Sequence, residues 1–115
     1  MENKKSSTGF VENENREWES TGEGVRRKIM GYDKDVMMVI VEFKKGAEGY
    51  VHSHPHKQVS YVAKGSFEVS IDSEKKVLKE GDVFFVNPDL KHGVIALEDG
   101  TLIDVFNPYR EDFLK

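Results

Sequence analysis

The stretch GAEGYVHSHPHKQVSYVAKG, residues 46–65, holds three of the chain's four histidines within five positions. His52 and His54 are two residues apart, so an extended strand would point both imidazoles from the same face. Along a strand that spacing is about 6–7 Å, which is close enough for two imidazoles to share one metal ion. The stretch therefore predicts a strand that presents a pair of metal ligands.

The residues that follow this pair extend the predicted site only in part. Pro55 interrupts the hydrogen-bond ladder, so we do not expect His56 to continue the row, whereas Gln58 re-enters an extended segment. The fourth histidine, His92, opens another apolar segment 38 residues beyond His54. We expect His92 to come from a second strand.

Outward from this stretch, the chain consists of short apolar segments separated by turn residues. Phe67, Val69 and Ile71 alternate with polar residues, which is typical of a strand with one buried face. Residues 36–43 are apolar except for Glu42, which favours a strand buried on both faces. We expect strands at 25–32, 36–43, 50–54, 58–63, 66–71, 76–78, 83–86, 93–97 and 102–106, hairpin-type connections at 64–66, 72–73 and 98–100, and a helical turn at 111–114. Nine short strands at close spacing predict an all-β sandwich or barrel.

The composition agrees with one all-β domain and excludes several classes of protein. Valine and isoleucine total 19 residues against 8 for alanine and leucine, which favours strands in this chain of 115 residues. The net charge of −4 argues against a nucleic-acid partner, and the absence of cysteine excludes disulfides and thiolate ligands. No apolar run approaches the roughly 20 residues of a membrane span, and no secretory signal opens the chain. We expect a cytoplasmic protein.

The N-terminal region differs in composition from the rest of the chain. Charged and small polar residues dominate it, and we expect residues 1–8 to form a flexible tail and residues 9–115 to form the β-barrel domain. Phe10 and Trp18 are large apolar side chains that gain from burial. We therefore expect residues 9–20 to dock on the domain or on a neighbouring subunit.

The histidine stretch and its surroundings resemble the cupin family. Five residues match the family's first motif position by position: Gly46, His52, His54, Gln58 and Gly65. Gln58 stands where the broad family most often has glutamate. The looser second motif opens at Gly81 and closes at His92, with Asn87, Asp89 and Ala96 departing from the usual residues. The resemblance implies a single-domain double-stranded β-helix, or jelly-roll barrel.

The segments 24–29, 52–58 and 104–113 are similar to the small cupins of the pectin-degradation KdgF type, a group that characteristically has glutamine as its fourth ligand. This resemblance implies a barrel, usually dimeric, that opens the ring of 4,5-unsaturated uronate monosaccharides from pectin or alginate to the linear keto form. The implied ligands of its divalent metal ion are His52, His54, Gln58 and His92. The implied active-site residues are Asp104, Phe106 and Arg110.

The residue types themselves agree with that chemistry. Three neutral imidazoles and a neutral amide leave a divalent ion its full charge of +2, so the site should prefer an anionic ligand such as a uronate carboxylate. Nitrogen and oxygen ligands suit nickel, zinc, iron or manganese. Asp104 and Phe106 share one face of their strand. If that face is the barrel interior, the Asp104 carboxylate needs a polar or charged partner and could shuttle a proton. Phe106 could form an apolar wall. Arg110 could bind the substrate carboxylate through two hydrogen bonds.

Each of these assignments has an alternative. Asp104 could satisfy a turn, Phe106 could belong to the core, and Arg110 could be a solvated charge or a dimer contact. Arg26 and Arg27 lie on opposite faces of a strand, so at most one of them faces the cavity.

Two further functions also remain open. A small metal-dependent cupin dioxygenase is one, although glutamate at position 58 would have favoured it. A non-catalytic module that binds a sugar acid or a metal is the other, and such a module would not need an acid–base group at Asp104. His56 and Tyr50 are additional candidates for the site or its mouth.

Overall fold

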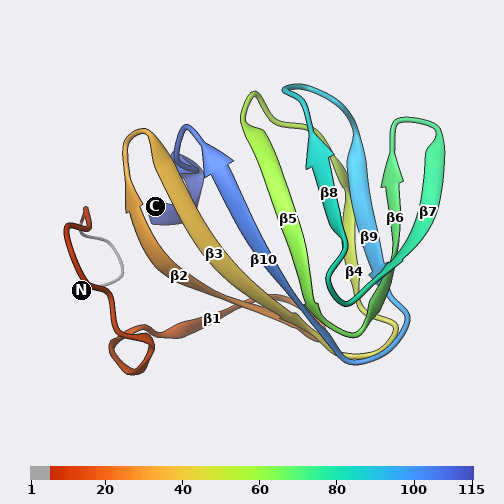
Figure 1. The fold of residues 1–115 in the computed structure, drawn as a ribbon, viewed down its shortest axis with the longest axis horizontal. Helices are drawn as coiled ribbons and strands as arrows, with labels where there is room; N and C mark the ends of the chain where they lie inside the picture. The colour runs from red at the N-terminus through yellow and green to blue at the C-terminus, as the bar shows by residue number, and fades with distance from the viewer. Residues whose placement is uncertain (1–5) are drawn as a thin grey trace.

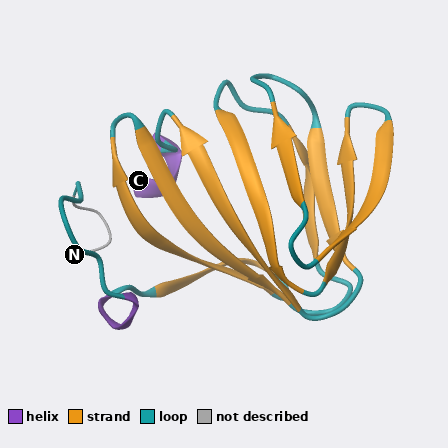
Figure 2. Cartoon of the chain, in the orientation of Figure 1, coloured by secondary structure: helices purple, strands orange, loops and turns teal. Residues whose placement is uncertain are grey.

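The computed structural model describes residues 6–115 as two antiparallel β-sheets that face each other (Figure 1). The strands are β1 Trp18–Gly22, β2 Val25–Asp33, β3 Val36–Phe43, β4 Glu48–His52, β5 Lys57–Lys64, β6 Ser66–Ile71, β7 Glu74–Lys79, β8 Val83–Val86, β9 His92–Ala96 and β10 Gly100–Asn107. One sheet has the order β1-β2-β3-β10-β5-β8 and the other the order β4-β9-β6-β7. The two helical pieces in Figure 2 are short 3-10 turns, η2 Asn13–Asn15 and η3 Glu111–Leu114. The predicted all-β jelly roll and its terminal turn are confirmed.

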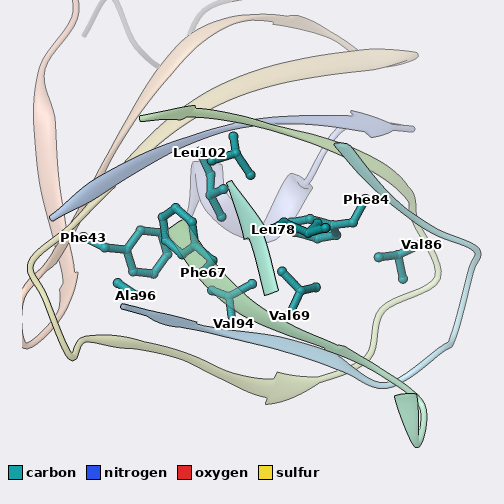
Figure 3. Packing of buried hydrophobic residues seen from close by; sticks show 10 residues of the cluster. Phe43, Phe67, Val69, Leu78, Phe84, Val86, Val94, Ala96 and Leu102 are labelled. Atoms are coloured by element: carbon teal, nitrogen blue, oxygen red, sulfur yellow. The ribbon is translucent and has the colours of Figure 1, made fainter. Parts of the chain in front are cut away.

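The main core lies between the two sheets, because alternate residues of the strands are apolar and point inward. Phe67 and Val69 of β6 are buried, as their alternation predicted, and they pack in one cluster with Leu102 of the six-stranded sheet (Figure 3). Val62 of the same sheet is also a fully buried member of this cluster. The rings of Phe43 and Phe67 meet edge to face with 5.2 Å between their centroids. Packing of this kind holds the two sheets at a fixed separation.

A second apolar cluster lies beside the main core and is covered by the C-terminal segment. Its buried members are Ile29, Tyr32, Met37, Val39 and Phe106. Tyr109 stacks on Tyr32 at 5.8 Å, and Phe113 of η3 meets Phe106 edge to face at 5.7 Å. These contacts fix η3 against the sheet and so determine where Arg110, which precedes η3, is placed.

The expectation that strand 36–43 is buried on both faces is wrong. Met37 and Val39 are fully buried, but Val36 and Met38 on the opposite face are exposed. The apolar residues of β3 cover the core on one side and belong to an apolar outer sheet surface on the other. Periodicity cannot separate these two cases, because both sides are apolar.

Two of the three expected hairpin connections are also wrong. Of the three expected connections, only residues 72–73 join two strands that are hydrogen-bonded neighbours, β6 and β7. Residues 64–66 and 98–100 carry the chain from one sheet to the other. Gly65 lies at φ +80°, and a Cβ there would lie 2.6 Å from the carbonyl oxygen of Asp99, so these two corners pack directly against each other. Glycine is required where backbones approach this closely.

The strand β1 was not predicted, because residues 19–22 are polar or glycine. It pairs with β2, and the Trp18 ring lies 4.0 Å from the Arg26 guanidinium and 4.4 Å from the Lys28 ammonium. Cation–π contacts thus dock Trp18 on the domain, as expected, whereas Phe10 is exposed.

Residues 1–5 of the predicted tail lie outside the described residues, and the Ser7 N–H donates to the Tyr32 carbonyl at 2.7 Å. Within residues 6–115, no helix is long and apolar enough to cross a membrane.

Candidate metal centre and active site

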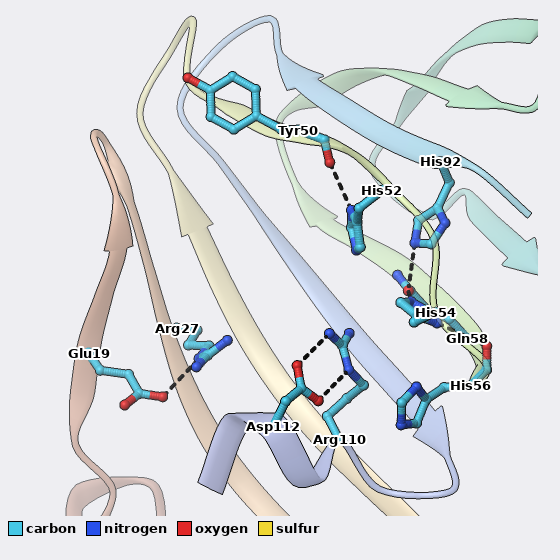
Figure 4. Close-up of polar contacts among 10 residues, drawn as sticks. All are labelled: Glu19, Arg27, Tyr50, His52, His54, His56, Gln58, His92, Arg110 and Asp112. Carbon is cyan, nitrogen blue, oxygen red and sulfur yellow. Dashed lines mark hydrogen bonds and ion pairs between the residues drawn. The ribbon is translucent and has the colours of Figure 1, made fainter. Parts of the chain in front are cut away.

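Three of the predicted ligands meet at one point of the structure. His52 ends β4, His92 begins β9 directly opposite it in the register, and His54 lies in the loop after β4. One ring nitrogen from each lies within 4.8 Å of those of the other two, and Figure 4 shows the rings turned toward a common centre. The observed strand β4 thus ends at His52, two residues before the end of the predicted strand 50–54. Its histidine and His54 nevertheless converge.

A glycine next to His92 allows the two histidine-bearing strands to approach. A Cβ at Gly93 would lie 2.9 Å from the carbonyl oxygen of Gly49 and 3.0 Å from the backbone nitrogen of Val51. A larger residue at this position would push β4 away from β9. His52 would then move away from His92.

The hydrogen bonds of the three histidines determine which ring nitrogen faces the centre. Each Nδ1 lies close to a backbone carbonyl oxygen: 2.8 Å for His52, 3.1 Å for His54 and 2.9 Å for His92. A carbonyl accepts only, so each Nδ1 carries the proton and each neutral ring keeps its lone pair on Nε2. This arrangement orients imidazoles as metal ligands.

The amide oxygen of Gln58 completes the cluster. Gln58 Oε1 lies 3.0 Å from His54 Nε2 and 3.2 Å from His92 Nε2. Burial lowers the pKa of His54, and it lowers the pKa of His92 to about 4, so both rings are neutral at physiological pH. Lone pairs therefore converge on one another in a buried place, which is unfavourable unless a cation lies among them. This donor set of three imidazoles and one amide oxygen fits a divalent transition metal.

Asp104 lies on β10 beside this cluster and is connected to it through a residue that sequence analysis missed. The Ser60 hydroxyl donates to Asp104 Oδ1 at 2.6 Å and accepts from Gln58 Nε2 at 2.8 Å. Burial raises the pKa of Asp104 to about 6, against the opposing effects of the Ser60 hydrogen bond and the Arg110 charge. Asp104 is therefore a carboxylate that can exchange a proton near neutral pH. Ser60 shares the strand face of Gln58, and that parity is the signal that could have revealed it.

Arg110 is buried next to the cavity but already has a partner. Its Nε and Nη2 donate to the two carboxylate oxygens of Asp112 at 3.1 and 2.9 Å. Although burial raises the pKa of Asp112, the hydrogen bond and charge of Arg110 outweigh it and hold that pKa below its ordinary value. The Arg110 guanidinium also lies 5.0 Å from the Phe106 ring and 4.2 Å from the Phe113 ring. Sequence analysis did not single out Asp112.

A cavity of about 230 Å³ brings the predicted groups together. Six predicted site residues line it: His52, Gln58, His92, Asp104, Phe106 and Arg110. Arg27 also lines the cavity and pairs with Glu19 at 2.8 Å, whereas Arg26 pairs with Glu42 on the exposed side. Tyr50 is exposed, and only its carbonyl contacts His52.

Two other features lie outside the histidine centre. The ring of His56 lies 5.2 Å from that of His54, but His56 does not join the three clustered nitrogens. A larger hollow of about 580 Å³ lies near Arg26, Lys44 and Lys64, and it contains none of the four histidines. The histidine cavity is therefore the place where nitrogen ligands, a carboxylate and a guanidinium meet.

The sequence of residues 39–106 matches the family model described as a cupin domain. The chain belongs to the cupin family. This cupin is 50% identical over 107 residues to the pectin degradation protein KdgF of Dickeya dadantii, covering 91% of this chain and 96% of that protein.

Two solved structures are also similar over most of the chain. A cupin described as RmlC-like from Shewanella frigidimarina is 48% identical, with a TM-score of 0.89, and the match covers 93% of this cupin and 96% of that chain. KdgF from Halomonas sp. is 40% identical with the same TM-score, and the match covers 94% of this cupin and 100% of that chain. The predicted resemblance to the KdgF group is confirmed.

Proposed function

We propose that this cupin opens the ring of 4,5-unsaturated uronate monosaccharides derived from pectin or alginate and yields the linear keto form. The observation that carries the proposal is the 50% identity to a pectin degradation protein over nearly the full chain. The cavity supports it independently, because cationic and acid–base groups line the same space.

The reaction is an isomerisation that requires one proton to move, and Asp104 is suited to move it. Asp104 takes the proton from the anomeric hydroxyl while C1 becomes a carbonyl and the bond from C1 to the ring oxygen breaks. The electron pair released to the ring oxygen gives an enolate at C5, which becomes the keto group when C4 receives a proton. A pKa of about 6 lets Asp104 accept the first proton and return one.

The other cavity residues bind and orient the substrate. We assign the divalent ion to His52, His54, Gln58 and His92, where it would supply positive charge for anionic oxygens of the sugar acid. Arg110 has donors beyond those bound to Asp112 and can hold the uronate carboxylate. Phe106 forms an apolar wall between His54 and Arg110, 5.8 Å from the former ring and 5.0 Å from the latter guanidinium.

We also propose that two copies pair through the outer face of the six-stranded sheet. Four neighbouring strands there present two cross-strand rows of apolar residues: Met38, Val105, Val59 and Phe85 in one row, and Ile40, Ile103, Tyr61 and Val83 in the other. A continuous apolar surface of this kind is typical of a protein–protein interface. The expected cytoplasmic location stays a prediction.

The test follows the ultraviolet absorbance of the conjugated double bond, which is lost when the keto form appears. Freshly prepared unsaturated monosaccharide should decay faster with this protein than alone, and a chelator should remove the acceleration. His52→Ala should lose both metal and acceleration. His56→Ala is the matched control and should keep its metal, because His56 lies outside the cluster.

The same preparations separate the alternative functions. Oxygen uptake without ring opening would favour the dioxygenase. Substrate binding without turnover in the metal-loaded chain would favour the binding module. Equal decay with and without the loaded protein would contradict the proposed activity.

A further inference from the structure

We infer that Ser60 is a positioning residue that fixes the orientation of the Gln58 amide, so that its oxygen and not its nitrogen faces the three histidines. This inference rests on the metal site of the proposed function and assigns a role to a residue outside the predicted site. It concerns the orientation of a ligand and not the chemical step.

The geometry places Ser60 between the proton-transfer group and the ligand. Ser60 is fully buried on β5, two residues after Gln58 and therefore on the same face, and it stands opposite Asp104 in the register with β10. Its oxygen lies 2.8 Å from Gln58 Nε2 and 2.6 Å from Asp104 Oδ1. No other hydroxyl among the described residues connects these two side chains.

The chemistry of the three groups gives this chain of hydrogen bonds one direction. A carboxylate only accepts, so the single hydroxyl proton of Ser60 is donated to Asp104. The Ser60 oxygen can then only accept from Gln58, and the side-chain group of Gln58 that donates is its NH₂. The amide oxygen is thereby turned the other way, to 3.0 Å from His54 Nε2 and 3.2 Å from His92 Nε2.

This orientation matters because an amide has two different ends. Rotation by half a turn would direct the NH₂ group at the cation position, where it offers no lone pair and repels positive charge. A glutamate at position 58 would present an oxygen in either orientation and would not require the device. Ser60 is therefore matched to glutamine at position 58.

The experiment measures binding of Co²⁺ alone, by titration and by the visible spectrum that reports its coordination. Ser60→Ala removes one oxygen atom and should weaken Co²⁺ binding by about 10- to 100-fold, the usual effect of losing a group that orients a ligand. The Co²⁺ spectrum should change with the loss of the amide oxygen. Ser70→Ala, which removes a half-buried hydroxyl from the other sheet, is the matched control and should leave binding unchanged.

Repeating Ser60→Ala in the Gln58→Glu protein distinguishes an effect on ligand orientation from a general effect on the structure. In the Gln58→Glu chain, Ser60→Ala should change Co²⁺ affinity by less than about threefold, because a carboxylate has no wrong orientation. Equal weakening in both backgrounds, or no weakening with Gln58 present, would overturn the inference. A wild-type chain that binds no Co²⁺ would overturn it together with the metal site. Failure of ring opening with Co²⁺ bound would overturn the proposed function alone.

Discussion

Replacing Asp104 with asparagine should stabilise the metal-free protein while removing its activity. The pKa of Asp104 is raised from 3.8 to about 6 in the folded chain, chiefly by burial. At neutral pH the folded state therefore holds a carboxylate in surroundings that disfavour its charge. An asparagine side chain at this position would have nearly the same shape, and its amide oxygen can still accept from Ser60.

The magnitude follows from the size of the pKa difference. About 2 pKa units correspond to about 3 kcal/mol at 1.36 kcal/mol per unit, as an order of magnitude. For a domain of this size, that difference should raise the melting temperature by on the order of 10 °C.

The sign of the pH dependence is fixed by the direction of the shift. Below pH 3.8 Asp104 is protonated in both the folded and the unfolded states, and it contributes no difference between them. As pH rises toward 6, the unfolded chain ionises first, so wild-type stability falls relative to Asp104→Asn. Above pH 6 the difference should be constant at its full value.

The assay is urea unfolding of chelator-treated wild type and Asp104→Asn across this pH range. Comparing the two chains cancels the contributions of the groups that both of them contain. The metal-loaded variant should retain its metal and lose about 10²- to 10⁴-fold in turnover, the usual contribution of a positioned acid–base group. A stability difference that does not change with pH would refute the reasoning, and so would full activity in Asp104→Asn.

Three further substitutions test the charge, the anion contact and the assembly. Gln58→Glu should keep the metal but raise KM for the uronate roughly tenfold, because it reduces the charge of the loaded site from +2 to +1; steady-state kinetics with measured metal content checks this. Arg110→Lys should raise KM about 10-fold or more, because lysine cannot make the paired hydrogen bonds to the substrate carboxylate. Arg26→Lys, on the exposed side, is the control and should leave KM unchanged. An unchanged KM in Arg110→Lys would exclude the carboxylate contact. Phe85 is 50% exposed on the six-stranded sheet, and Phe85→Glu should give monomers in sedimentation. Val77 is 57% exposed on the other sheet, and Val77→Glu should leave the dimer intact. A monomeric wild type would exclude the pairing.

The histidine site was predictable because its information is local in sequence. His52 and His54 are two residues apart, and Pro55 ends the strand near them, so their direction followed from the period of a strand. The strand pattern located nine of the ten strands in residues 6–115 for the same reason. His92 was found as the start of another apolar segment and as the end of the looser second motif, but its position opposite His52 required the fold.

The missed features depend on contacts between distant segments or on residues with no apolar signal. The strand β1 is polar after Trp18, and the two corners near Gly65 and Gly100 look like hairpin turns in sequence. The Arg110–Asp112 pair could not be separated from ordinary charges by sequence, because it is the packing of Tyr109 and Phe113 that holds that segment beside the cavity.

Asp104 belongs both to the part of the site that strand parity predicts and to the part that contacts between distant segments create. Its parity on β10 put it on one face with Phe106, but its link to the ligand set passes through Ser60, which is 44 residues away in sequence. Under the two proposals one carboxylate has two tasks: it would exchange a proton with the substrate and, through Ser60, direct the oxygen of Gln58. Taking the proton from the substrate requires the ionised form, which burial disfavours. In the proposed mechanism, the ionised form of Asp104 is the form that works, and it is also the form that lowers the stability of the folded state. The predicted gain in stability and the predicted loss of turnover in Asp104→Asn therefore have one cause, the removal of this buried carboxylate.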